Sequence, residues 1–347
     1  TTFPQMLGVA STFQPELAEA MTTAIHKQIM ALGARQVLAP VLDVARDPRW
    51  GRVEETFGED PTLTSHFGSA YIRGMQSDDL KQGVIATGKH FIGHSNSQGG
   101  LNCAPVHMGM GEIFNYFLAP FHAAIRDAKL ASMMNAYPEL DGEVVAASRR
   151  ILTDLLRNRL GFKGLVVSDY EAIVMLNNFH KVARNLVDAG QMALNAGIDV
   201  EMPSVVCYGD PLKEALKNGT VTMDVIDQAV SRHLTAKFEL GLFENPYADE
   251  ARVLEVFETP QNRALAREIA QKSMVLLKND GILPLKKTIR SLAVIGPNAA
   301  AGRNQLGDYS YAAMSYMMEY KQMENSCFIN MDKEHFRKHD IKVTNVL

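Results

Sequence analysis

A carboxylate stands just beyond an apolar run in the second half of the sequence. Residues 165–167, Leu-Val-Val, predict a short buried strand, and Asp169 follows two residues later. In a parallel α/β barrel the carboxyl ends of the strands point into the active site, so a carboxylate placed there is a candidate nucleophile or base. The structural alternative is a helix N-cap, because Asp after a strand commonly accepts the first free N–H groups of the next helix.

Four other apolar or β-branched runs end in polar side chains in the same way. They lead to Asp43, to Lys89 and His90, to Asn135 and Tyr137, and to Glu201. Stretches at helical spacing separate the runs, and strands alternating with helices predict right-handed βαβ units and a parallel sheet. A closed barrel would bring all five strand ends around one pocket.

The fold class predicted from this pattern is α/β, with a (β/α)8 TIM-like barrel followed by the beginning of a second α/β sandwich domain. Residues 1–245 are assigned to the barrel, which is expected to be incomplete at its N-terminus because five strands are visible where eight close such a fold. Residues 246–285 are expected to form a linker and a connecting helix. Residues 286–347 are expected to begin a truncated sandwich domain, with a buried strand over 291–297.

The predicted helices have ordinary start and stop signals. Ser148 is placed to cap one of them and Gly161 to end it, and Pro120 is expected to break another. The helices are expected over residues 108–127, 148–161, 186–195, 221–242 and 261–278.

Composition narrows the function classes. The chain has 347 residues, 46% of them hydrophobic, and a net charge of -4, which predicts a globular protein with a sizeable core. No basic run indicates a nucleic-acid surface, and no apolar run reaches the length that spans a bilayer. Three widely spaced cysteines predict neither a metal site nor a disulfide framework, and no HExxH or CxxC motif occurs. No cofactor is expected. A small-molecule substrate is expected; the compartment and a homo-oligomeric state are left open.

Several motifs, in order and spacing, resemble glycoside hydrolase family three, the β-glucosidase and β-xylosidase family. The resemblance covers residues 1 to about 312. It rests on RDPRWGR at 46–52, EETFGEDP at 54–61, GKHF at 88–91, MNAY at 134–137, VSDY at 167–170, KSMVLLKNDG at 272–281 and VIGPNA at 294–299.

The resemblance implies a retaining, exo-acting hydrolase of terminal β-D-glucosyl or β-D-xylosyl residues, without a cofactor. Asp169 matches the family's nucleophile, which forms a covalent glycosyl intermediate. The residues implied to bind the sugar, or to lie beside the nucleophile, are Arg52, Lys89, His90, Tyr137 and Tyr170.

Structural alternatives stay open for these residues. Arg52 is also placed to form an ion pair with Glu54, Glu55 or Asp60. Lys89 and His90 are alternatively a buried polar pair, although two such side chains are costly to bury unpaired. Tyr137 and Trp50 are alternatively packing aromatics. Asp199 and Glu201 are interpreted as rim or structural carboxylates.

The sequence also departs from the family pattern. The family's acid/base is a Glu in the second domain, beyond the last residue of this chain, and a sugar-binding Asp of the barrel falls before Thr1. The chain alone is therefore expected to be impaired as a hydrolase. Leu101 stands where Arg is common, which puts sugar affinity in question. Glu171 stands where Gly is usual and adds a charge that would raise the pKa of Asp169 if the two are close.

Three other functions are weighed against hydrolysis. A β-N-acetylglucosaminidase of the same family would carry an Asp-Ser-His loop, which residues 95–101 lack; His94 is interpreted as a surface residue of that loop. A sugar-binding protein without turnover is favoured by Leu101, Glu171 and the absent acid/base. A Schiff-base aldolase using Lys89 has no support from the neighbouring residues.

Overall fold

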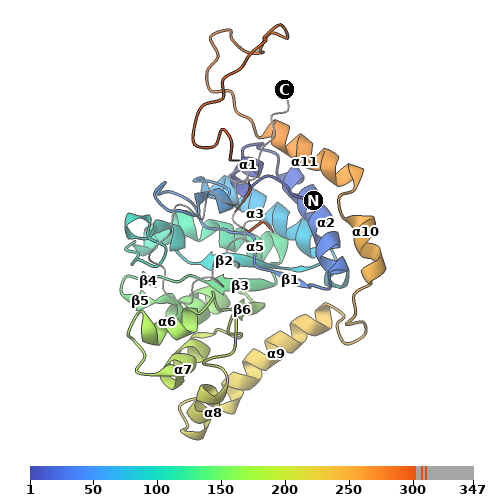
Figure 1. Ribbon diagram of the computed structural model, residues 1–347. Helices are drawn as coiled ribbons and strands as arrows, with labels where there is room; N and C mark the ends of the chain where they lie inside the picture. The colour runs from blue at the N-terminus through green and yellow to red at the C-terminus, as the bar shows by residue number, and fades with distance from the viewer. Residues whose placement is uncertain (302–305, 308, 311–347) are drawn as a thin grey trace. The chain divides into compact units, whose positions relative to one another are not determined.

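A parallel sheet carries the strand ends that the sequence singled out. In the computed structural model, which describes residues 1–301, 306–307 and 309–310, four strands pair in the order β1-β2-β3-β6 (Figure 1). They are β1 (Gln36–Val37), β2 (Ile85–Phe91), β3 (Ser132–Asn135) and β6 (Leu165–Val167). A further parallel bridge joins Val167 to Val200, which places the next segment of the chain beyond β6.

The strands are therefore neighbours in chain order and all parallel, as in a TIM-type barrel. The fold is α/β, as predicted. Within the described residues the strands form an open arc that runs from β1 to Val200, without closing into a ring. A small antiparallel pair, β4 (Glu139–Leu140) and β5 (Glu143–Val144), follows β3.

Helices cover this arc, and Figure 1 shows α2, α3 and α5 on one side of the strands and α6, α7 and α8 beyond β6. The helix α3 packs between α2 and α5. The bounds are α1 (Met6–Ala10), α2 (Pro15–Ala31), α3 (Pro61–Gln76), α5 (Ala119–Ala128), α6 (Ala172–Asn178), α7 (Leu186–Ala196), α8 (Asp210–Lys217) and α9 (Met223–Glu239).

A glycine allows the close approach of α2 and α3. A Cβ at Gly74 would lie 2.1 Å from Thr22 Oγ1 and 2.3 Å from the carbonyl oxygen of Glu19, distances that no side chain tolerates. His26 Nδ1 lies 2.7 Å from the carbonyl oxygen of Gly74 and ties the two helices at the same place.

Side chains alternate across the sheet and so define two faces. Met133 and Val166 join the large core that lies under the helices, where Phe91 meets Phe121 edge to face at 5.2 Å. Met134, Leu165 and Val167 form a separate cluster on the opposite face. The strand ends therefore present their functional side chains from a sheet that is packed on both faces.

The helix signals read from the sequence are mostly confirmed. Pro120 stands at the beginning of α5, after α4 (Met110–Glu112) and a π-helical turn (Ile113–Phe117), so the predicted break is present. Ser148 Oγ accepts a hydrogen bond from the Ile151 N–H at 3.0 Å, and Gly161 has a φ of 71°. The segment between them, Arg150–Arg159, is wound as a π-helix.

Two expectations for the C-terminal part are wrong. After α10 (Val253–Val256), helix α11 (Pro260–Lys272) ends before residue 278. Residues 291–297, expected as a buried strand, have no strand structure and are exposed, and Ile295 has 92% of its surface in solvent. A strand is stable only when neighbours pair with it and cover it, and no described residue does so here. Most of the expected sandwich segment, 286–347, lies outside the described residues.

The chain divides into two units, one of residues 3–275 with Thr1, and one that continues from Leu276. All of the site residues described below belong to the first unit. Among the helices of the described residues, none is both long enough and apolar enough to cross a membrane.

Candidate active site

Asp169 lies at the carboxyl end of β6, buried, with 7% of its surface exposed. Its Oδ1 accepts a hydrogen bond from the Tyr170 N–H at 2.7 Å, and its own N–H donates to Asn135 Oδ1 at 3.2 Å, which ties the ends of β6 and β3 together. The N-cap position of α6 belongs to Glu171. The helix-cap alternative for the Asp169 side chain is therefore wrong, and its Oδ2 has no hydrogen-bond partner among the described residues.

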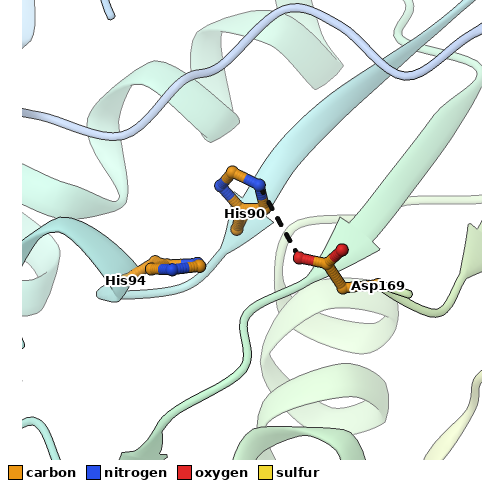
Figure 2. A group of neighbouring side chains, drawn as sticks. All are labelled: His90, His94 and Asp169. Atoms are coloured by element: carbon orange, nitrogen blue, oxygen red, sulfur yellow. Dashed lines mark ion pairs between the residues drawn. The ribbon is translucent and has the colours of Figure 1, made fainter. Parts of the chain in front are cut away.

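His90 faces Asp169 from the end of β2 (Figure 2). Its Nε2 lies 3.7 Å from Asp169 Oδ2, and the ring is fully buried. Asp43 Oδ2 accepts both the backbone N–H of His90, at 2.9 Å, and the ring Nδ1, at 2.8 Å. An ionised carboxylate can only accept hydrogen bonds, so with Asp43 ionised the ring nitrogen bonded to it is the protonated one. Asp43 thus fixes the tautomer of His90 with a bare Nε2 toward Asp169.

His94 completes this cluster, and its interpretation as a surface residue is wrong. The chain turns at Gly93, which has a φ of 89° that glycine adopts without strain, and brings the His94 ring back to 4.5 Å from that of His90. The side chain has no exposed surface, and its Nε2 lies 2.8 Å from Asn102 Oδ1. Sequence spacing alone could not show this, because the turn that buries the ring follows the end of the strand.

Arg52 and Lys89 supply positive charge to the same region. Arg52 donates to both carboxylate oxygens of Glu55, at 2.7 and 2.9 Å, so the ion-pair alternative is realised. The same guanidinium is close enough to lower the pKa of Asp169. Lys89 is 8% exposed and acts on Asp169 in the same direction. The ion pair therefore does not remove Arg52 from the site.

The aromatic residues Tyr137, Tyr170 and Trp50 differ in their burial and in their distance from Asp169. Tyr137 donates its hydroxyl to the carbonyl oxygen of Tyr170 at 2.8 Å and lies beside the Asp169 carboxylate. Burial, and after it the charge of Asp169, raises the pKa of the phenol. The Tyr170 side chain is 48% exposed, and only its main chain is bonded to the site. Trp50 is buried under the His94 ring at 5.4 Å, as the packing alternative expected.

Burial dominates the electrostatics of the cluster. It raises the pKa of Asp169, against the N–H of Tyr170 and the charges of Lys89 and Arg52, which lower it. It raises the pKa of Asp43 to about 7 and lowers the pKa of His94 to about 3. The pKa of His90 is also lowered by burial, so both imidazoles are neutral near pH 7.

The family resemblance implies that Asp169 is the nucleophile of glycoside hydrolysis. On that basis we expect Lys89→Gln to move the acid limb of the pH dependence of kcat/KM for an aryl glycoside to higher pH. The Lys89 ammonium lowers the pKa of Asp169, so its removal raises that pKa. A nucleophilic carboxylate must be ionised, and activity is lost as the pH falls through its pKa. The measurement is a pH–rate profile, with exposed Lys163→Gln as the control. An acid limb unchanged by Lys89→Gln contradicts the proposed coupling.

The two departures from the family pattern have clear local environments. Glu171 has a φ of 62°, the left-handed region in which a glycine is free of steric cost. It is exposed, and it is not among the causes of the Asp169 pKa shift, so the expected charge effect is not found. Leu101 is 68% exposed and follows Gly100, where a Cβ would lie 2.5 Å from the carbonyl carbon of Arg49 and 2.6 Å from Trp50 N.

Asp199 and Glu201 are structural carboxylates. Asp199 binds Arg157 at 2.6 Å and Arg232 at 2.7 Å, and also accepts the N–H of Val166 at 2.8 Å. Glu201 accepts the backbone N–H groups of three consecutive residues, 206–208, and so holds a loop. Both side chains are thus held by protein partners.

Comparisons with known proteins agree with the resemblance seen in the motifs. The sequence model of the glycosyl hydrolase family 3 N-terminal domain matches residues 1–236, and that of the C-terminal domain matches residues 274–341.

Among curated relatives, a β-xylosidase of Formosa agariphila is 38% identical over 323 residues, which are 89% of this chain and 44% of that protein. A periplasmic β-glucosidase of Salmonella typhimurium is 36% identical over 91% of this chain and 42% of that protein. The chain thus spans less than half the length of these relatives.

Solved structures show the same similarity. A β-glucosidase from Erythrobacter marinus superposes with a TM-score of 0.80 at 36% identity, over 82% of this chain and 38% of that one. A β-glucosidase from Listeria innocua, solved in complex with glucose, gives a TM-score of 0.78 at 35% identity, over 82% of this chain and 40% of that one.

Proposed function

Since the chain belongs to glycosyl hydrolase family 3, we propose that its protein is a retaining, exo-acting β-glycosidase with Asp169 as the nucleophile. The single observation that carries this assignment is the bare Oδ2 of Asp169, buried at a strand end and facing His90 at 3.7 Å. Residues 1–245 are the proposed catalytic domain, 246–285 the linker and 286–347 the start of the second domain.

In the proposed reaction, Asp169 Oδ2 attacks the anomeric carbon and the bond to the leaving oxygen breaks. A carboxylic acid gives its proton to that oxygen, and water then attacks the glycosyl ester, gives a proton back and frees Asp169. The carboxylates nearest the cluster are not assigned the acid/base role, because Asp43 holds His90 and Glu55 holds Arg52. As the family resemblance implies, we place that role on a Glu of the second domain.

The other polar groups are assigned to the sugar. Lys89 and Arg52 donate to its hydroxyls, and the bare nitrogens of His90 and His94 accept from them. Hydrogen bonds of this kind raise the rate when they strengthen as the oxocarbenium-like transition state forms. Tyr137, whose hydroxyl is bonded to the Tyr170 carbonyl oxygen beside the Asp169 carboxylate, is assigned to stabilise that carboxylate, because the phenol opposes the rise in its pKa that burial causes. Tyr170, with its half-exposed ring, is assigned to the rim of the sugar site.

The substrate class is a terminal β-D-glucosyl or β-D-xylosyl residue. Similar proteins carry both names: a β-xylosidase in Formosa agariphila and a β-glucosidase in Salmonella typhimurium. The decisive experiment offers the purified full-length protein aryl β-glucosides and aryl β-xylosides and measures release of the aryl group. Hydrolysis of either supports the proposal, and the ratio of the two kcat/KM values assigns the sugar.

A sugar-binding protein without turnover is the second candidate, favoured by the exposed apolar Leu101 where an arginine is common. A 2-deoxy-2-fluoro glycoside with a good leaving group separates the two candidates. The hydrolase gains the mass of one fluoro-sugar on the peptide that contains Asp169. Binding of glucose without release of aryl groups or labelling would favour the second candidate.

A further inference from the structure

Three side-chain atoms around Asp169 converge without a donor among them. Each of His90, His94 and Asp169 offers one ligand atom, and these three atoms lie within 4.8 Å of one another; His90 Nε2 and Asp169 Oδ2 are 3.7 Å apart (Figure 2). Two atoms of this cluster, His94 Nδ1 and Asp169 Oδ2, are buried without a hydrogen-bond partner in the part of the chain that the structure describes. Buried polar atoms are normally paired, so three lone pairs aimed at one point call for an occupant that attracts them all.

The protonation of both rings is fixed by their other contacts. Asp43 Oδ2 takes the N–H of His90 Nδ1, as argued above. Asn102 Oδ1, which can only accept, lies 2.8 Å from His94 Nε2, so that nitrogen is the protonated one. His90 Nε2, which faces Asp169, and His94 Nδ1 are therefore the bare nitrogens, and moving the ring proton onto either of them would break a bond that positions its ring.

We infer that these three atoms form a binding site for a divalent transition-metal cation of the Zn²⁺ class, which competes with the sugar for the active site. Two neutral imidazole nitrogens and one carboxylate oxygen are a common Zn²⁺ ligand set, with a fourth position left for water. This inference contradicts the expectation from the sequence that the protein has no metal site. That expectation did not consider residues 90, 94 and 169 as ligands, because they form no recognised metal-binding motif.

The surroundings support metal binding in the manner of known zinc sites. A ligating histidine commonly donates its other N–H to a carboxylate or carbonyl oxygen, as His90 does to Asp43 and His94 to Asn102. In a tetrahedral site with bonds of about 2.0–2.1 Å, ligand atoms lie roughly 3.4 Å apart. His90 Nε2 and Asp169 Oδ2 already lie 3.7 Å apart, so the remaining movement is that of the His94 ring.

Positive charge close by limits the affinity. Lys89 and Arg52 both act on Asp169, whereas Asp43 and Glu55 supply compensating negative charge. The cation is therefore expected to be an exchangeable inhibitor that a chelator removes.

Isothermal titration of Zn²⁺ into the purified full-length protein, without a histidine tag, tests the site directly. One binding event per chain is expected, which EDTA reverses. His94→Gln is expected to lower the affinity at least tenfold, and Asp43→Asn, which removes the partner of a ligand, by about 10–100-fold. Co²⁺ bound in place of Zn²⁺ should give the visible absorption of a four-coordinate site, which His94→Gln abolishes.

His107→Gln is the matched control. His107 Nδ1 also lies 3.7 Å from a carboxylate oxygen, that of Asp141, but the pair is exposed and has no third ligand. Equal Zn²⁺ affinity in wild type and His94→Gln, or no binding by wild type, would overturn the inference. Circular dichroism verifies the fold, and Asp169→Asn, which is close to isosteric, replaces His94→Gln if the latter does not fold.

The claim of competition rests on the proposed function, whereas the claim of binding does not. With an aryl glycoside as substrate, Zn²⁺ should raise KM and leave kcat unchanged, and EDTA should reverse the effect. Metal binding without any hydrolysis by the metal-free protein would leave the site standing and contradict the proposed function. A fall in kcat at constant KM would place the inhibitory cation elsewhere.

Discussion

We expect Asp169→Asn to lower kcat/KM for aryl glycosides by about four to six orders of magnitude, because in the proposed reaction an amide cannot form the glycosyl ester and loss of a nucleophile typically costs that much. The fold should survive the change, since Asn retains an acceptor for the Tyr170 N–H and removes a charge that is buried. Steady-state kinetics with the purified variant measures the loss.

A second variant separates a nucleophile from a residue that only positions the sugar. Asp169→Ala leaves room for a small anion, and azide added to it should displace an activated aryl group and give a glycosyl azide with inverted configuration. Asp154→Asn, an exposed carboxylate on the Arg150–Arg159 segment, is the control and should retain full activity. Rescue with retention of configuration, or activity left in Asp169→Asn, would remove Asp169 from the role of nucleophile.

The largest expected effect on stability is that of Asp199→Ala. The substitution leaves Arg157 and Arg232 without their carboxylate and the Val166 N–H without its acceptor. The Asp199 and Arg157 side chains are 1% and 8% exposed, so solvent does not replace these bonds. Removing one partner of a buried ion pair costs about 3–5 kcal/mol in the free energy of unfolding.

Urea unfolding followed by circular dichroism measures this loss. The control is Asp188→Asn, which breaks an ion pair with Arg184, whose side chain is 86% exposed. Pairs of this kind contribute about 0–1 kcal/mol. If the two variants lose the same stability, the Asp199 cluster is not the tie between β6 and helix α9 that the geometry indicates.

The sequence predicted the elements that repeat a simple pattern. Apolar runs ending in polar residues located β2, β3 and β6, because a strand buried on both faces needs an uninterrupted apolar run. The residues brought together at their ends, Lys89, His90, Tyr137 and Asp169, are those that the motifs indicated; their roles in catalysis stay predictions.

What the sequence did not predict depends on contacts between distant residues. The burial of His94 follows from a left-handed turn at Gly93 and from a hydrogen bond to Asn102. Neither can be predicted from the spacing of apolar residues in the sequence. The bidentate pairing of Arg52 with Glu55 was one of three equal possibilities in the sequence. Residues 291–297 have the composition of a buried strand, but composition does not supply the partner strands that would bury it.

The contact at Gly100 has a consequence for altering which sugars the protein accepts. The main chain at Gly100 lies so close to that of Arg49 and Trp50 that a side chain at position 100 would have to displace them. The position of residues 98–101 is therefore coupled to that of the segment that leads to Arg52. A mutant library that varies position 100 would push Arg52 out of place and damage turnover for every sugar alike. Varying position 101 alone, where the side chain is already in solvent, would change selectivity without that penalty.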